Sequence, residues 1–138
     1  MAELADTSAW TASARDPELR RTFDSAVARR EVATCGAVAF ELLHGARNAT
    51  EFTAMRTGLD RLRQCPIGPR EWRRALSISE VLAHQGGMHH RRVKHPDLLI
   101  AAAAESADMP LLHYDADFDV IAAITGQPTR WIAPRGSL

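Results

Sequence analysis

Four acidic side chains, far apart in the sequence, occupy positions that a parallel α/β fold would bring together. Asp6 and Asp115 each follow a short apolar segment, so each is expected just past the end of a strand. The carboxyl ends of parallel strands form one edge of a sheet, and ligands bind beyond that edge. Asp97 lies in the first turn of a helix that begins at Pro96, where the helix dipole favours a carboxylate. Glu41 lies within an apolar helix.

Two of these acids are expected to face the inside of the protein. Ile100, Ala101 and Ala104 share the helix face of Asp97. Glu41 likewise shares its face with the small or apolar residues of its own helix. A buried charge without a partner is unfavourable. Both carboxylates therefore need a compensating positive charge.

The sequence offers no obvious internal cation as a partner for these acids. No Lys or Arg occurs between His95 and Thr125, and Arg47 is too far along the helix of Glu41 to share its face. Carboxylates that converge without a cation raise one another's pKa values. A divalent metal removes the conflict, and oxygen ligands without a thiolate favour Mg²⁺, or Mn²⁺ in its place. Taken singly, each acid could equally be a turn, helix-start or solvent-facing residue; their joint placement predicts the metal site.

The elements that must position these acids follow from the apolar pattern and from the helix-capping and chain-breaking residues. Strands are predicted over residues 3–6, 32–35, 109–114 and 129–132. Helices are predicted from Asp16, over 38–47, from Asn48 through Arg63, and over 69–84, 96–107 and 118–124. Proline and glycine break the chain around Ile67, and residues 85–94 are predicted as a loop. One face of the 69–84 helix carries Trp72, Ala75, Leu76, Ser79 and Leu82.

Alternating strands and helices of these lengths indicate an α/β fold with a parallel sheet covered on both faces. The 138 residues suit a single domain over residues 1–138, without repeats or a linker. No apolar run approaches the roughly 20 residues that span a bilayer. The first ten residues carry acids where a secretory signal has basic residues, so we expect a cytoplasmic protein with no membrane partner. Cys35 and Cys65 form no CxxC pair and are expected as reduced core residues.

Charge is distributed unevenly along a chain whose formal net charge is zero. Residues 61–94 include eight basic residues and two acids, whereas residues 95–125 include six acids and no Lys or Arg. Sixteen of the seventeen basic residues are Arg, whose planar side chain binds phosphate through two hydrogen bonds. An acidic pocket beside a basic rim follows from this pattern, although Arg-rich composition also has purely genomic causes.

Four segments together resemble the motifs of VapC-type PIN-domain toxins. Residues 6–10, Asp-Thr-Ser-Ala-Trp, are similar to the opening strand motif of that family. Glu41, in AFELLHGAR, resembles its second acidic position, and Asp97, in HPDLLIAAAAE, resembles its third. Residues 114–118, Tyr-Asp-Ala-Asp-Phe, resemble its final motif. The resemblance covers nearly the whole chain and implies a PIN-like three-layer α/β/α sandwich with a central, mostly parallel sheet.

The resemblance implies a Mg²⁺-dependent endoribonuclease, the toxin component of a type II toxin–antitoxin system. It implies that water activated by the metal hydrolyses phosphodiester bonds, leaving a 5′-phosphate and a 3′-hydroxyl. The catalytic and metal-binding acids carried over are Asp6, Glu41, Asp97 and Asp115, with Asp117 as a further metal ligand or a support. Thr7 and Ser8 are expected to position Asp6 or a phosphate.

The resemblance also implies partners. The substrate is expected to be structured cellular RNA, transfer or ribosomal, cut at exposed single-stranded loops. Arg91, Arg92 and Lys94 directly precede Asp97 and are the predicted RNA-binding rim, with 70–74 as a weaker extension. A cognate small antitoxin is expected to inhibit the protein, which would be a homodimer, or a heterotetramer or larger with the antitoxin.

Three other functions fit the sequence poorly. The His residues at 84, 89, 90 and 95 do not follow the HExxH spacing of a zinc protease. Residues 115–119 begin like an EF-hand loop, but Val120 replaces the required Gly and Gly126 the required Glu. The Asp-Ala-Asp run lies too late in the chain for a haloacid-dehalogenase-type phosphotransferase. A catalytically silent PIN-like module that binds RNA or a protein remains the alternative.

Overall fold

A five-stranded parallel sheet forms the centre of the protein. The computed structural model describes residues 1–138. The strands are β1 (Glu3–Ala5), β2 (Val32–Thr34), β3 (Arg63–Gln64), β4 (Leu111–His113) and β5 (Thr129–Trp131). Their order in the sheet is β3-β2-β1-β4-β5, and all four neighbouring pairs are parallel. The acids that follow β1 and β4 therefore leave the sheet from adjacent strands at the same edge.

Successive strand residues face opposite sides of the sheet, and both sides are apolar. In β1, Leu4 belongs to the larger core cluster and Ala5 to the smaller one. In β4, Leu111 and Leu112 divide in the same way. This alternation is the two-residue period of a strand, and apolar residues on both faces are typical of a parallel sheet covered by helices.

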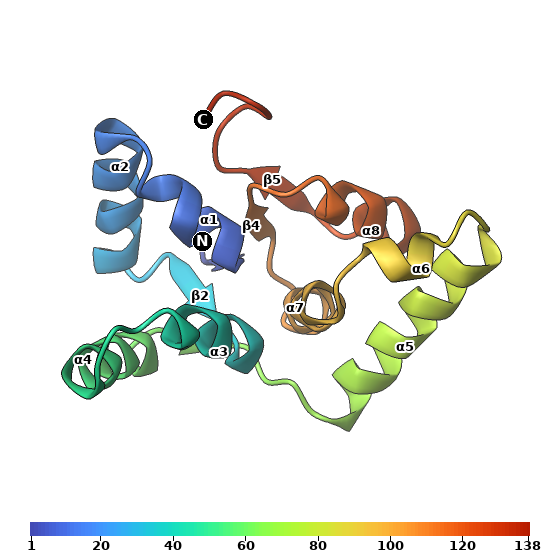
Figure 1. The fold of residues 1–138 in the computed structure, drawn as a ribbon, viewed down its shortest axis with the longest axis horizontal. Helices are drawn as coiled ribbons and strands as arrows, with labels where there is room; N and C mark the ends of the chain where they lie inside the picture. Colours follow the sequence, from blue (N-terminus) through green and yellow to red (C-terminus); the bar gives the residue numbers. More distant parts are fainter.

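Eight helices cover the two faces (Figure 1). They are α1 (Thr7–Ser13), α2 (Pro17–Ala28), α3 (Gly36–His44), α4 (Ala49–Asp60), α5 (Pro69–His84), α6 (His89–Arg92), α7 (His95–Ser106) and α8 (Asp117–Thr125). Residues of α1 and α2 pack in the smaller core cluster, and residues of α3, α5, α7 and α8 in the larger one. The predicted α/β/α arrangement is confirmed, and the sheet is entirely parallel.

Helix α7 is the central element of the larger core. Figure 1 looks along its axis and shows it between α3, α5 and α8. Ile100 and the four alanines at 101–104 are buried. Alanine side chains allow neighbouring helices to approach closely, and a helix that is apolar on most of its surface is a buried helix. This burial fixes the position of Asp97 in the first turn of α7.

Several predicted helix starts are confirmed by their caps. The Asp16 carboxylate accepts a hydrogen bond from the Leu19 amide at 2.8 Å. The Asn48 side chain accepts one from the Glu51 amide at 2.8 Å. Such bonds satisfy amides that have no partner within the helix. Most predicted element ends agree with the structure within one to three residues.

Three local predictions were wrong. Helix α1 was not predicted, because a run of hydroxyl residues offers the backbone competing hydrogen bonds and hides a helix. The helix predicted through Arg63 ends at Asp60, and the short strand β3 follows it. The predicted loop over 85–94 contains the single-turn helix α6, which begins after Met88 in the left-handed conformation (φ 61°).

The buried face of α5 also differs from the predicted one. Its buried residues are Glu71, Ala75, Ile78 and Leu82, whereas Trp72 and Leu76 are exposed. Ile78 lies in the core because α5 packs on α7 through the face that contains Ile78, and not through the face that carries Trp72.

Cys35 and Cys65 are free and buried, as predicted. None of the helices has both the length and the apolar character needed to cross a membrane.

Candidate metal centre

Asp6 and Asp115 meet at the carboxyl edge of the sheet. The Asp6 amide donates a hydrogen bond to the Leu112 carbonyl at 2.9 Å, which aligns the end of β1 with β4. Asp115 follows β4 after one intervening residue. Adjacent strands lie about 4.8 Å apart. The strand-end argument therefore places these two acids correctly at one edge.

Three carboxylates converge closely there. Asp97, Asp115 and Asp117 each offer an oxygen, and these oxygens lie within 4.8 Å of one another. Asp97 is buried, and the other two are half-buried. They come from the start of α7, the turn after β4 and the start of α8. Three hard oxygen donors at this separation form a set that a divalent cation can bridge.

Asp6 adds a buried carboxylate to this edge. Its Oδ2 accepts a hydrogen bond from the Ser8 amide at 2.9 Å, and its Oδ1 is buried without a partner. Burial raises the pKa of Asp6 and the Glu41 charge raises it further, while the Ser8 side chain and amide act in the opposite direction. One oxygen of Asp6 is thus fixed by the fold, and the other is free to bind a ligand.

Asp97 has the most strongly perturbed carboxyl group of the cluster. Burial, followed by the charges of Asp6, Asp115, Glu41 and Asp117, raises its pKa to about 7. Its Oδ2 is buried and has no hydrogen-bond partner. Four neighbouring acids raise the pKa of this one group, which is the arrangement that a bound dication would relieve.

Glu41 differs from the sequence prediction in its environment. The residue is exposed, so the expected burial amid small residues was wrong. Its Oε1 accepts a hydrogen bond from the Thr7 hydroxyl at 2.9 Å. The Glu41 charge nevertheless contributes to the raised pKa values of Asp6 and Asp97. Helix α3 therefore presents Glu41 at the open side of the cluster, where Thr7 holds it.

His113 is a residue of the site that the sequence prediction did not assign. It is fully buried at the end of β4. Its Nδ1 accepts a hydrogen bond from the Asp115 amide at 3.2 Å, and burial lowers its pKa. The Asp117 amide in turn donates to Asp115 Oδ1 at 2.9 Å. A neutral imidazole thus fixes the turn that carries Asp115 and Asp117, and its position directly before that turn was the available signal.

Ser8 contacts Asp6, which is one of the two roles expected for it. Its amide binds Asp6, and its Oγ accepts a hydrogen bond from the Tyr114 amide at 2.9 Å. Ser8 thus links the start of α1 to the segment after β4. The segments that follow β1 and β4 are tied together through this one residue.

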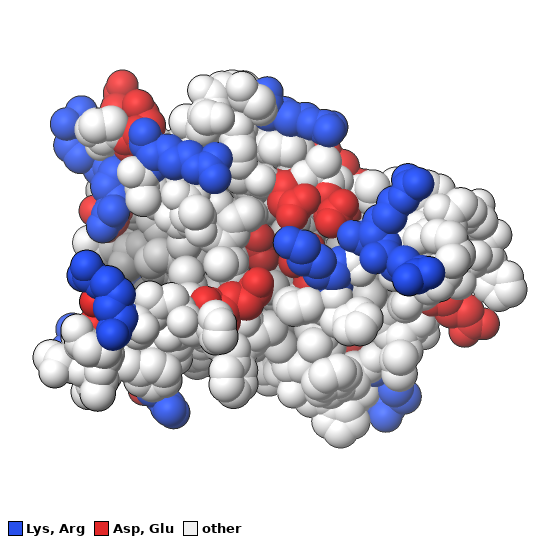
Figure 2. Space-filling view, viewed as in Figure 1, with Lys and Arg blue, Asp and Glu red and all other residues white.

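Basic side chains lie beside the acidic cluster. Arg91, Arg92 and Lys94 are all exposed, in α6 and directly after it. Burial and the Asp115 charge raise the pKa of Asp117, while the Lys94 charge opposes them. Figure 2 shows acidic side chains in the middle of this face and Lys and Arg side chains next to them, over α6. The surface changes from acidic to basic over a short distance.

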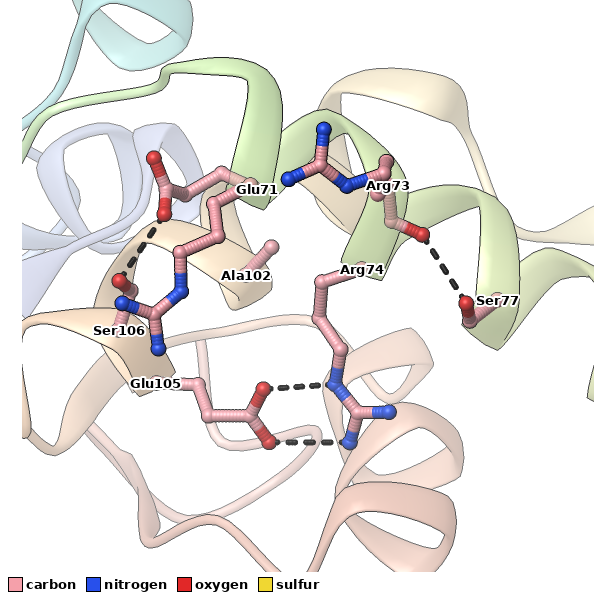
Figure 3. Close-up of a pocket in the computed structure, with 8 residues that line it drawn as sticks. Glu71, Arg73, Arg74, Ser77, Ala102, Glu105 and Ser106 are labelled. Atoms are coloured by element: carbon pink, nitrogen blue, oxygen red, sulfur yellow. Dashed lines mark hydrogen bonds and ion pairs between the residues drawn. The ribbon is translucent and has the colours of Figure 1, made fainter.

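The arginines of α5 belong to a different place. Arg70, Arg73 and Arg74 line a pocket of about 400 Å³ between α5 and the end of α7. Arg74 donates two hydrogen bonds to Glu105, at 2.7 and 3.1 Å (Figure 3). Glu105 is eight residues, or about 12 Å of helix, from Asp97. This pocket is thus separate from the acidic cluster.

The donor set of the cluster fits a hard divalent cation. All of its side-chain donors are carboxylate oxygens, and the two cysteines are buried in the core rather than at the edge. Two of the oxygens are buried without partners, on Asp6 and Asp97. Carboxylates of this kind suit Mg²⁺ or Mn²⁺.

The fold and this edge define an α/β protein with a carboxylate cluster beyond the ends of its parallel strands. Residues 4–124 match the PIN-domain family, and the chain belongs to that family. Among its relatives, Ribonuclease VapC18 of Mycobacterium tuberculosis (strain ATCC 25618 / H37Rv) is 45% identical over 138 residues, covering 100% of both chains. Ribonuclease VapC51 of the same strain is 40% identical over 135 residues, covering 98% of this chain and 96% of the relative.

A solved structure shares the fold. The DNA-bound VapBC structure from Salmonella typhimurium superposes with a TM-score of 0.72 at 18% identity, covering 96% of this chain and 100% of the other. The resemblance to VapC-type PIN-domain toxins is therefore confirmed at the level of family and fold.

Proposed function

We propose that this protein is a Mg²⁺-dependent endoribonuclease and the toxin of a type II toxin–antitoxin pair. One observation carries the proposal: oxygens of Asp97, Asp115 and Asp117 lie within 4.8 Å of one another, with no cation among them. The names of the relatives, both ribonucleases, support the reaction. A structural neighbour is a VapBC structure, which supports the toxin assignment.

Asp6, Glu41, Asp97 and Asp115 are the proposed catalytic acids and metal ligands, with Asp117 as a fifth ligand or a support. A bound divalent cation supplies a water of lowered pKa and neutralises charge on the phosphate. The chain's own part is to hold carboxylates in place: Ser8 fixes one oxygen of Asp6, and Thr7 fixes one oxygen of Glu41. Pre-set ligands need no rearrangement when charge develops in the transition state.

His113 has a positioning role in this mechanism. Its Nδ1 accepts the Asp115 amide, so the imidazole stays neutral on that nitrogen and the turn keeps its shape. The buried ring packs on Phe118, with centroids 5.2 Å apart. His113 thereby sets the distance between β4 and the start of α8, and with it the separation of Asp115 and Asp117.

The proposed RNA-binding rim is Arg91, Arg92 and Lys94. These exposed side chains lie next to the acids and are able to hold phosphates on one side of the cut. Structured RNA such as transfer or ribosomal RNA, cut at an unpaired loop, is the proposed substrate class, because unpaired bases can be splayed out and bound by a protein.

The proposed setting is a cytoplasmic protein of one domain that pairs with a small antitoxin. The VapBC neighbour supports an antitoxin partner, in a heterotetramer or a larger assembly, with a homodimer when the toxin is alone.

The experiment that tests this function is cleavage of total RNA by the purified chain. We expect cleavage in Mg²⁺ that stops in chelator and is absent from Asp6→Asn and Asp97→Asn. Asp24→Asn is the matched control, since Asp24 is exposed and pairs only with Arg20. Cleavage that continues in chelator would exclude the metal mechanism, and RNA binding without any cleavage would indicate the catalytically silent module instead.

A further inference from the structure

Two aromatic side chains stand beside the acidic cluster at the same edge of the sheet. Tyr114 follows β4 directly and precedes Asp115, and Trp131 ends β5, in register with His113. The Tyr114 and Trp131 ring centroids are 5.5 Å apart, with an angle of 81° between the planes. Both side chains are half-buried rather than covered. A pair of aromatic residues therefore lies at the edge of the sheet that carries the acids.

An arginine lies over each ring. The Arg15 Cζ atom is 6.0 Å from the Tyr114 centroid, and the Arg135 Cζ atom is 5.9 Å from the Trp131 centroid. Both arginines are exposed, and neither takes part in any of the seven ion pairs of the protein. Each guanidinium group thus lies over a ring without a carboxylate partner, and such a group can bind an anion or stack on a flat ligand.

The two rings are held in place by their other contacts. The Trp131 Nε1 atom donates to both carboxylate oxygens of Asp119 at 3.2 Å, and its ring packs on His113 with centroids 4.9 Å apart. The Tyr114 amide is fixed by Ser8, and its hydroxyl oxygen accepts the Leu138 amide at 3.1 Å. Rings fixed in advance lose little freedom when a ligand stacks on them.

From this geometry we propose that Tyr114 and Trp131, with Arg15 and Arg135, bind an unpaired nucleobase of the RNA next to the cleaved phosphate. The inference rests on the proposed ribonuclease function. Proteins hold splayed-out bases by stacking them on aromatic rings and on Arg planes. Tyr114 and Asp115 are consecutive, with Cα atoms about 3.8 Å apart, so the base belongs to a nucleotide close to the cut.

The position of this aromatic pair complements the basic rim. In Figure 1 the C-terminal tail that follows β5 and the basic helix α6 lie at opposite sides of α8. An RNA strand that crosses the acids can therefore contact α6 on one side and the rings on the other. Phosphate contacts fix the register of the strand without choosing a sequence, and the stacked base fixes which nucleotide stands at the cut.

The test uses the full chain and a short oligoribonucleotide that it cleaves in Mg²⁺. The base is removed from one nucleotide at a time around the cut, and kcat/KM is measured for each abasic substrate. The same scan is run with Trp131→Leu and Tyr114→Leu, and with Trp131→Phe and Tyr114→Phe, which keep a ring. Trp72→Leu is the matched control, because Trp72 is exposed on α5 away from the acids.

We expect one abasic position to lower kcat/KM of the unmodified protein by about tenfold or more, the usual effect of losing one stacked base. In the two Leu variants, removing the base at this position should change kcat/KM by no more than about twofold. The Phe variants and Trp72→Leu should keep it. Should a Leu variant fail to fold, the exposed pair Arg15→Gln with Arg135→Gln gives the same comparison.

A flat abasic scan in an unmodified protein that still cleaves in Mg²⁺ would overturn this inference alone. The inference would also be overturned if Trp131→Leu lowered kcat/KM by the same factor on the intact substrate and on every abasic substrate. A purely structural role of Trp131 affects all substrates alike. Absence of metal-dependent cleavage from every RNA tested would instead end the proposed function and this inference with it.

Discussion

The two ends of α7 carry acids in opposite environments. At its start, Asp97 is 5% exposed, faces other carboxylates and has an oxygen without a partner. Near its end, Glu105 receives two hydrogen bonds from Arg74. Both acids lie on one helix, so helix propensity cannot explain the difference. An acid that is paired within the fold stabilises the architecture, and one that is left unpaired marks a place where a ligand completes the charge balance.

Glu71 shows the same distinction on α5. It accepts the Gly68 amide at 2.7 Å and the Ser106 hydroxyl at 3.0 Å, and these bonds lower its pKa, the Gly68 bond most. Asp97, by contrast, has a raised pKa. Both residues have little solvent-exposed surface and count as buried. Burial alone therefore does not identify the site; the direction of the pKa change and the number of satisfied oxygens do.

The largest expected effect is on cleavage. Asp97→Asn should lower kcat/KM for RNA by about 1,000-fold or more, since a metal supplies several kcal/mol of transition-state stabilisation. Glu105→Gln removes a carboxylate from the same helix and should change kcat/KM by less than about twofold, because it binds only Arg74. Equal losses in the two variants would break the distinction between the two ends of α7.

The next effect is on stability as a function of pH, measured by urea unfolding in chelator. The pKa of Asp97 is raised to about 7, so the folded protein holds a proton that the unfolded chain releases near pH 4. The folded state binds more protons in this window, so the free energy of unfolding should fall as pH rises from about 4 to about 7, by a few kcal/mol at most. In Asp97→Asn most of this decrease in the free energy of unfolding should be absent, whereas Glu105→Gln should show it in full. Identical profiles in both variants would contradict the assignment.

A smaller effect concerns the two groups of arginines. Arg91→Gln with Arg92→Gln should raise KM for RNA by about tenfold and leave kcat nearly unchanged. The slope of log KM against log salt concentration should fall by about 0.7 for each phosphate contact that is lost. Arg70→Gln with Arg73→Gln removes the same charge from the α5 pocket and should leave KM within about twofold. Steady-state kinetics at several salt concentrations separates them. A larger increase in KM from the α5 double variant than from the α6 double variant would indicate that the RNA binds at the α5 pocket instead.

The smallest effect is expected from the ion pair at the end of α7. Arg74→Met should lower the free energy of unfolding by about 1 kcal/mol or less, because both partners are partly exposed, at 40% and 29% of their side chains. Equilibrium unfolding in urea measures it. A loss well above this value would show that the pair is a larger part of the core than its exposure indicates.

The sequence predicted four of the five strands, their parallel arrangement and the edge at which the acids meet. Those predictions depend on local patterns: apolar runs, caps such as Asp16 and Asn48, and acids directly after strands. Asp97 was correctly expected to be buried because its face on α7 is apolar for three turns. These signals are strong because burial of the sheet on both faces leaves few alternatives.

The predictions failed where tertiary packing decides. The sequence of α5 carries two apolar faces, one with Ala75, Ile78 and Leu82 and one with Trp72, and the packing of α5 on α7 buries the first. Glu41 was expected to be buried, but α3 turns it toward the open side of the site. Ser8 was expected to act near Asp6, but its bond to the distant Tyr114 amide depends on the fold. His113 was not assigned, because its residue type does not reveal that its ring accepts the Asp115 amide two residues further on.

The central claim is that the carboxylates at the start of α7 are held together for a divalent cation. Urea unfolding of the unmodified protein and of Asp97→Asn, each in chelator and in Mg²⁺ at pH 7.5, tests it most directly. In chelator, Asp97→Asn should be more stable by about 1 kcal/mol, because repulsion is relieved. Mg²⁺ at about 100 times its dissociation constant should stabilise only the unmodified protein, by about 2.7 kcal/mol. Lower stability of the variant in chelator, with an equal response of both proteins to Mg²⁺, would contradict the claim.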